Sequence, residues 1–218
     1  MGTRIAGSAL PVVSADQALQ RLIEGNRRFA RNLPSESVAP AQQARAAFAE
    51  GQRPFAITLS CSDSRVPAEL IFDQGIGDLF VIRVAGNVVA PSLIGSVEFA
   101  AAAFGTRLAV VMGHSHCGAI RATLDELRQE GDGVLTDNIR DIVERCRAPV
   151  ETVLSVAGRQ APRDFLLREA VRANVRNSCD HLRHGSRLLE RLCAEEGMRI
   201  VGAEYALETG EVTFLDDA

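Results

Sequence analysis

The run Leu108-Ala109-Val110-Val111-Met112-Gly113, followed directly by His114, decides the fold class of this chain. Its residues are apolar without alternation, which is typical of a strand buried on both faces of a sheet. Two comparable runs come earlier in the chain, at 55–60 and 79–85. Helical stretches fill the intervals between the runs, at about residues 67–72 and 92–104. Buried strands that alternate with helices predict an α/β fold with a mostly parallel central β-sheet flanked by helices.

Further elements are predicted on both sides of this core. Ser14 is a typical N-cap residue before a helix that runs through Phe29, and a second short helix is predicted over residues 40–50. Amphipathic stretches later in the chain predict long helices, at 118–130, 137–156 and 164–196. Two β-prone runs joined by a turn predict C-terminal edge strands, at 200–207 and 211–215. The length of 218 residues fits a single domain over 1–218, with an N-terminal helical arm at about 1–50 and a core at 51–218.

The composition excludes several classes of function. Hydrophobic residues make up 46% of the chain and charged residues 24%, which predicts a packed core rather than disorder. The net charge is −4 and acids and bases are interleaved, so a nucleic-acid partner is not expected. Lysine is absent, which excludes Schiff-base and phosphate-loop chemistry that depends on it. No stretch approaches the roughly 20 apolar residues of a membrane span. The spacings of the five cysteines are not those of a small disulfide-rich fold, which favours a reducing compartment. The expected location is therefore cytoplasmic.

Three candidate metal ligands lie at the ends of predicted strands. Cys61 follows the first strand, His114 ends the third, and Cys117 comes one helical turn after His114. The carboxyl ends of parallel strands meet at one edge of a sheet, which is where ligands bind in open α/β folds. Two thiolates and one imidazole form a soft donor set that suits Zn²⁺. Three protein ligands leave a fourth position open, and this pattern distinguishes a catalytic zinc site from a structural one.

Other interpretations of these cysteines remain open. A single cysteine at a strand end is more often a small buried hydrophobic residue than a ligand. A structural site would need a fourth thiolate, and Cys146, Cys179 and Cys193 are available on predicted helices. None of the three has a C-x-x-C partner, so packing between helices explains them better. A thiol redox protein would use a reactive cysteine pair, whereas Cys61 and Cys117 are explained more simply as co-ligands.

A carboxylate and a guanidinium follow the first ligand. Asp63 lies two residues after Cys61, and Arg65 lies two residues after Asp63. A tight turn after a strand can join these side chains in a bidentate pair. The carboxylate could then bind the metal and close the site, or be held by Arg65 and accept a hydrogen bond from water on the metal. An ordinary turn with a surface salt bridge is the simpler explanation of this spacing taken alone.

The two motifs together resemble those of the β-class carbonic anhydrases. They are Cys61-Ser62-Asp63-Ser64-Arg65-Val66-Pro67 and Gly113-His114-Ser115-His116-Cys117-Gly118. The resemblance extends from Leu22-Ile23-Glu24-Gly25-Asn26-Arg27-Arg28-Phe29 to the closing strand at 202–215, and so covers nearly the whole chain. It implies one Zn²⁺ per chain on Cys61, His114 and Cys117, with Asp63 and Arg65 as a catalytic dyad and Asp63 as a conditional fourth ligand.

The resemblance also implies a substrate pocket. Gln52 matches a glutamine that orients bicarbonate, and Gly118 offers a backbone N–H at a helix start. Phe80, Ala85 and Phe99 match residues that line an apolar carbon dioxide pocket, with phenylalanine at 99 where plant-type members have tyrosine. Part of this pocket comes from a neighbouring subunit in the family. A homodimer or a larger even homo-oligomer is therefore implied.

The activity that the resemblance implies is reversible hydration of carbon dioxide to bicarbonate and a proton, by attack of zinc-bound hydroxide. Two alternatives remain: a related zinc hydrolase acting on carbon disulfide or carbonyl sulfide, and a non-catalytic zinc- or bicarbonate-binding protein. His116 is a candidate proton shuttle, although a local structural role explains it better. His181 and His184 have the spacing of a helical ligand pair, and we expect them to face solvent. Some bacterial members bind inhibitory bicarbonate at a second site through a tryptophan, an arginine and a tyrosine. Arg83 matches the arginine and Tyr205 the tyrosine, but Thr58 occupies the tryptophan position, so this control is not expected here.

Overall fold

The computed structural model describes residues 13–33, 35, 49, 51–130 and 136–215. Five strands form one sheet in the order β2-β1-β3-β4-β5. They are β1 (Ala56–Ser60), β2 (Leu79–Arg83), β3 (Leu108–His114), β4 (Arg199–Tyr205) and β5 (Val212–Leu215). The first four are parallel to one another, and β5 pairs antiparallel with β4. The predicted α/β class, the mostly parallel sheet and the C-terminal edge pair are confirmed.

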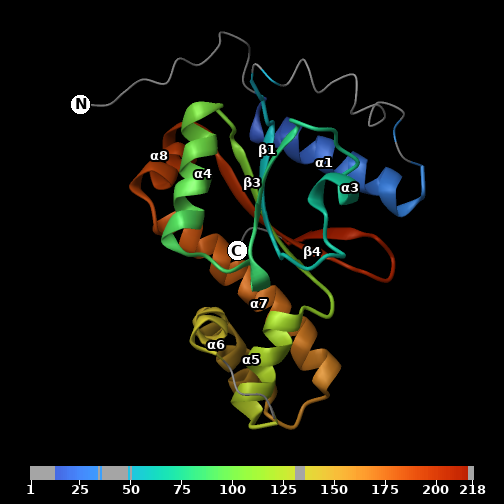
Figure 1. Ribbon diagram of the computed structural model, residues 1–218, viewed down its shortest axis with the longest axis vertical. Coiled ribbons are helices and arrows are strands. Elements are labelled where there is room, and N and C mark those ends of the chain that lie inside the picture. The colour runs from blue at the N-terminus through green and yellow to red at the C-terminus, as the bar shows by residue number, and fades with distance from the viewer. Residues whose placement is uncertain (1–12, 34, 36–48, 50, 131–135, 216–218) are drawn as a thin grey trace.

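Helices cover both faces of this sheet (Figure 1). On one face lie α1 (Ala15–Ala30) and α3 (Ala68–Ile71), which pack on alternate residues of β3 and β4. On the other face lie α4 (Pro91–Ala103), α7 (Arg163–His184) and α8 (Arg187–Glu195). Both sides of β1 and β3 are therefore buried, which explains why their sequences are apolar without alternation.

A third group of helices lies beyond the carboxyl ends of the strands (Figure 1). It consists of α5 (Gly118–Arg128), α6 (Asp137–Ala157) and the first half of α7. These helices form a separate buried cluster with Leu124, Val150 and Leu166 at its centre. Cys61 and Cys117 belong to the same cluster. The candidate ligands therefore lie where the sheet meets this helical group.

The N-terminal helix is fixed by its cap and by one buried side chain. Ser14 and Gln17 form a capping box at its start. Asn26 is buried and donates hydrogen bonds to the carbonyls of Ile71 (3.1 Å) and Gly210 (2.9 Å). Its side-chain oxygen accepts a third bond from the Val212 N–H at 2.8 Å. One asparagine thus joins α1 to the end of α3 and to the turn before β5.

The prediction of one long helix over 164–196 is wrong, because this segment forms two helices, α7 and α8. α7 ends at His184, and Gly185 is its C-cap. Ser186 then takes an extended conformation, and its hydroxyl accepts a hydrogen bond from the Leu189 N–H as the N-cap of α8. A Cβ at residue 185 would lie 2.4 Å from the carbonyl oxygen of His181, so glycine suits the break. The helix predicted over residues 40–50 falls almost entirely outside the described residues.

None of the helices within the described ranges is long and apolar enough to cross a membrane.

Candidate metal centre

Three secondary-structure ends position the three candidate ligands. Cys61 follows β1, His114 is the last residue of β3, and Cys117 is the N-cap residue of α5. β1 and β3 are adjacent and parallel with Ser60 opposite Met112, so their ends project at the same edge of the sheet. All three residues are buried, and their ligand atoms lie within 4.8 Å of one another. The described residues contain no other such group of three.

The chemistry of this cluster fits a metal ion. The ring of His114 is fully buried, and its Nδ1 lies 2.8 Å from the carbonyl oxygen of Ser115. A carbonyl can only accept, so Nδ1 carries the proton and Nε2 presents a lone pair. Nε2 has no hydrogen-bond partner among the described residues, although it is buried. A buried lone pair that faces two sulfur atoms is suited to a metal such as zinc.

Each of the two ligand thiols shifts the pKa of the other. A hydrogen bond from Cys117 lowers the pKa of Cys61, and the same bond raises the pKa of Cys117. Burial further raises the pKa of Cys117, and the hydrogen bond from the Gly86 N–H further lowers the pKa of Cys61. A divalent cation would favour both sulfurs as thiolates.

Asp63 and Arg65 form a bidentate pair beside the ligands. Arg65 Nε and Nη2 donate to Asp63 Oδ1 and Oδ2 at 2.9 and 2.7 Å, and the Arg65 backbone N–H donates to Oδ1 at 2.9 Å. These bonds hold the pKa of Asp63 well below its usual range. Asp63 Oδ2 lies 4.0 Å from His114 Nε2, so the carboxylate is close to the ligand atoms without leaving its arginine.

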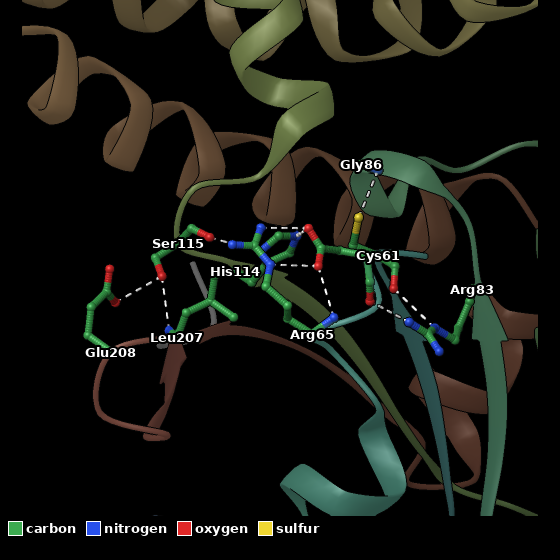
Figure 2. Close-up of polar contacts among 9 residues, drawn as sticks. Cys61, Arg65, Arg83, Gly86, His114, Ser115, Leu207 and Glu208 are labelled. Atoms are coloured by element: carbon green, nitrogen blue, oxygen red, sulfur yellow. Dashed lines mark hydrogen bonds and ion pairs between the residues drawn. The ribbon is translucent and has the colours of Figure 1, made fainter.

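Two groups from the end of β2 and the turn after it support the ligand loop (Figure 2). Arg83 donates to the carbonyl oxygens of Cys61 at 3.2 Å and Asp63 at 2.6 Å. The Gly86 N–H donates to the sulfur of Cys61 at 3.4 Å. Both contacts fix the backbone or the sulfur of the first ligand. The guanidinium of Arg83 thus binds the ligand loop of its own chain.

The loop between His114 and Cys117 is held by the C-terminal turn. Ser115 Oγ donates to Glu208 at 3.0 Å and accepts from the Leu207 N–H at 3.0 Å (Figure 2). His116 has a left-handed backbone with φ 56°, and its Nε2 lies 2.6 Å from Glu208. The two side chains are more than half exposed. Glu208 is thus a support for this loop that the sequence analysis did not identify.

The predicted pocket residues separate into two groups. Ala85 begins the short turn η2 (Ala85–Asn87) that contacts Cys61, and Gly118 starts α5 directly after Cys117. Phe80 and Phe99 lie elsewhere. Phe80 is opposite Ile57, four residues before Cys61, which is about 13 Å along the strand at the usual rise. Its ring packs against Phe99, which is 50% exposed, and Phe104.

Phe80 and Phe99 therefore do not line the ligand cluster of their own chain. Gln52 is exposed in the segment before β1.

The other three cysteines, and His181 and His184, do not belong to the ligand group. Cys146 is buried on α6, and burial raises its pKa to about 12. Cys179 is buried and Cys193 half-buried, both on helices that pack on the sheet. His181 and His184 are exposed on α7 and line a hollow of about 270 Å³ between α4 and α7. Neither histidine belongs to a group that could hold a metal ion among the described residues.

Sequence reasoning missed the turn of Gly86 and Asn87, which contacts the ligand Cys61. Both residues have positive φ, at 69° and 44°. A Gly-Asn pair directly after a buried strand is itself a turn signal, since these residues adopt left-handed conformations most easily. Asn174 and Ser178 of α7 donate hydrogen bonds to this turn. They gave no such signal, because they lie inside an unbroken helical pattern.

Taken together, these features define a class of protein: a parallel α/β fold with a buried Cys-His-Cys centre suited to zinc, beside a carboxylate–guanidinium pair. Residues 56–212 match the family model described as carbonic anhydrase. "Carbonic anhydrase 2" of Mycobacterium tuberculosis is 37% identical over 212 residues, which cover 95% of this chain and 96% of that protein.

Solved structures agree. A β-carbonic anhydrase of Aspergillus fumigatus has a TM-score of 0.73 at 25% identity and covers 92% of this chain and 91% of its own. A β-carbonic anhydrase of Sordaria macrospora, one of two described as tetrameric, has a TM-score of 0.68 at 22% identity, with 91% and 97% covered. The chain therefore belongs to the β-class carbonic anhydrase family and is an enzyme of that family.

Proposed function

We propose that this enzyme catalyses the reversible hydration of carbon dioxide to bicarbonate and a proton at one Zn²⁺ per chain. Cys61, His114 and Cys117 would hold the ion. The observation that carries the proposal is the buried, unpartnered Nε2 of His114, which faces two sulfur atoms next to an arginine-bound carboxylate. A purely structural site would have no use for that carboxylate.

Zinc, when bound, would supply a Lewis acid that lowers the pKa of water to about 7, a magnitude taken from a carbonic anhydrase with three histidine ligands. The residues of this chain would orient the reactants. Asp63 Oδ2 would accept a hydrogen bond from the reacting water and so fix its direction. Arg65 would keep Asp63 from binding the metal itself, because both carboxylate oxygens already accept from the guanidinium.

The substrate side of the reaction requires a largely apolar pocket, since carbon dioxide has no hydrogen-bond donor. Ala85 lies beside the ligand loop, whereas Phe80 and Phe99 lie too far along β2 and α4 to reach it. We therefore assign Phe80 and Phe99 to the pocket of a second subunit. A homodimer or a larger even assembly would complete each site. Gln52 and the Gly118 N–H would then bind the oxygens of bicarbonate.

The cytoplasm is the proposed location. None of the five cysteines, all of which lie in the described residues, forms a disulfide, and Cys61 and Cys117 have to remain reduced to act as ligands. An oxidising compartment would favour a disulfide between these neighbouring sulfurs over metal binding.

Stopped-flow measurement of carbon dioxide hydration, with zinc quantified per chain, tests the proposal. Cys61→Ala and His114→Ala should each abolish both zinc binding and hydration. Cys193→Ala is the matched control, because this half-buried thiol belongs to no ligand group and should leave both readouts unchanged. A wild-type rate of carbon dioxide hydration by metal-free Cys61→Ala would overturn the proposal. Parallel assays with carbon disulfide and carbonyl sulfide would reveal whether a different substrate is preferred.

A further inference from the structure

A backbone group from outside the ligand loop touches the metal centre. The Gly86 N–H donates to Cys61 Sγ at 3.4 Å, across the space between the ends of β2 and β1 (Figure 2). A hydrogen bond to a thiolate withdraws charge from the sulfur and fixes its direction. The position of Gly86 therefore affects both the charge and the orientation that Cys61 presents to a metal.

The turn that carries this N–H has an unusual backbone. Gly86 and Asn87 both have positive φ, at 69° and 44°. A left-handed conformation is unfavourable for a residue with a side chain, and two in succession need support from the surrounding structure. Glycine suits position 86 for a second reason, because a Cβ there would lie 3.0 Å from the Cβ of Ala119 and 3.3 Å from Cys146 Sγ, both tight contacts.

That support comes from α7. Asn174 Nδ2 donates to the carbonyl oxygen of Gly86 at 2.8 Å, and Ser178 Oγ donates to that of Asn87 at 3.0 Å. The two side chains are four residues apart, so they lie on the same face of the helix one turn from each other. Both are buried, with exposures of 1% and 2%. Asn174 Oδ1 has no partner among the described residues, so its amide is used mainly through the bond to the turn.

We propose that Asn174 and Ser178 are positioning residues of the metal centre. They hold the Gly86–Asn87 turn in its left-handed conformation and thereby keep the Gly86 N–H on the sulfur of Cys61. Neither residue belongs to the ligand group, so both act only through the turn. The inference rests on the proposed zinc site.

The test compares metal binding in full-length variants. In the Co²⁺-substituted protein, the thiolate-to-cobalt absorption band reports the charge on the sulfurs. Asn174→Leu should shift this band to longer wavelength, because a sulfur without its hydrogen bond gives up charge more easily. The same variant should bind zinc about 10-fold more weakly, the lower end of the effect of losing a residue that orients a ligand. Ser178→Ala should shift both readouts in the same direction.

Leu182→Ala is the control for general loss of stability. Leu182 is fully buried on α7, two turns beyond Asn174, and packs in the cluster between the helix and the sheet. Leu182→Ala should lower the urea concentration at which the protein unfolds. It should leave the thiolate-to-cobalt band and the zinc affinity unchanged.

An unchanged band and zinc affinity in folded Asn174→Leu would overturn the inference; if that variant does not fold, unchanged readouts in Ser178→Ala would do so. A wild-type protein with no thiolate-to-cobalt band would instead overturn the zinc site itself.

Discussion

At the scale of single residues, the pairing with Arg65 keeps the carboxyl group of Asp63 ionised at neutral pH. The guanidinium lowers the pKa of Asp63, so the native carboxylate ionises more easily than in the unfolded chain, where the value is about 3.9. The pair therefore contributes stability above that pH, and the contribution is lost as the pH falls through the lowered native value. A change of activity near neutrality cannot come from protonation of Asp63.

The first prediction concerns Asp63→Ala. The variant should keep one zinc per chain, because the three ligands remain, and its hydration kcat should fall about 100-fold, since a preoriented acceptor is removed. Stopped-flow kinetics and metal analysis measure the two quantities separately. Asp141→Ala is the control, because Asp141 forms a similar pair with Arg145 on the exposed side of α6. Wild-type kcat in Asp63→Ala would contradict the role assigned to the carboxylate.

The same scale shows what local sequence can predict. Cys61, Asp63 and Arg65 lie within five residues after a strand, and His114 and Cys117 are one turn apart, so their proximity follows from local geometry and from the pairing of two strands. Glu208 and Asn174 are supports from distant segments. Nothing near them in the sequence indicates which loop they contact, because that depends on how the helices and the C-terminal turn pack.

At the scale of elements, α1 is held against α3 by a close backbone approach at Gly25. A Cβ at this position would lie 1.8 Å from the carbonyl oxygen of Phe72. Any side chain would therefore separate the two helices. The neighbouring Asn26 bonds to Ile71 and to the turn before β5, so the separation would also break buried hydrogen bonds.

The second prediction follows: Gly25→Ala should destabilise the fold by about 3 kcal/mol or more, as overpacking that the backbone cannot relieve. Urea unfolding followed by circular dichroism provides the measurement. Gly95→Ala in α4 is the matched control, since a Cβ there meets nothing within 4 Å. The control should gain about 0.5–1 kcal/mol from the helix propensity of alanine. Equal stabilities of the two variants would disprove the close approach.

Element boundaries were predictable where a local signal exists. The capping box at Ser14 and the apolar run of β3 gave the start of α1 and the buried strand. The break between α7 and α8 was missed because the apolar periodicity continues across it. Gly185 and Ser186 carry the signal, as a glycine C-cap followed by a serine N-cap.

At the scale of the whole molecule, the exposed aromatic group on β2 and α4 suggests assembly. The rings of Phe80, Phe99 and Phe104 pack together with centroids 5.7–6.2 Å apart, and Phe99 is half exposed beside the sheet edge formed by β2. Exposed apolar surface costs free energy in water, and an open strand edge can pair with another chain. Contact with a second copy would bury the apolar surface and cover this edge.

The third prediction tests this proposal. Phe99→Arg should weaken the proposed dimer, because a buried unpaired charge at an interface is unfavourable. Analytical ultracentrifugation should show monomers at micromolar concentration, zinc content should be unchanged, and hydration should be strongly reduced since each pocket lacks its partner's aromatic residues. Ile139→Arg on α6, another exposed apolar position, should remain assembled and active. A fully active monomer would show that each chain completes its own pocket.

The fold class could be predicted because the alternation of apolar strands and helices determines it. The residues that a second subunit contributes could not be predicted from periodicity, since an interface aromatic and a core aromatic give the same pattern. Phe80 and Phe99 were assigned through the family resemblance alone.

The alignment of β1 on β3 has a practical consequence for preparing the protein. Cys61 meets His114 only when Ser60 lies opposite Met112, and a shift of one residue would turn Cys61 to the other face of the sheet. Cys117 joins them only when α5 has docked. Zinc would thus be captured late, by chains that are already folded correctly. The metal content of a refolded sample would then count its native molecules, a quality assay that needs no substrate.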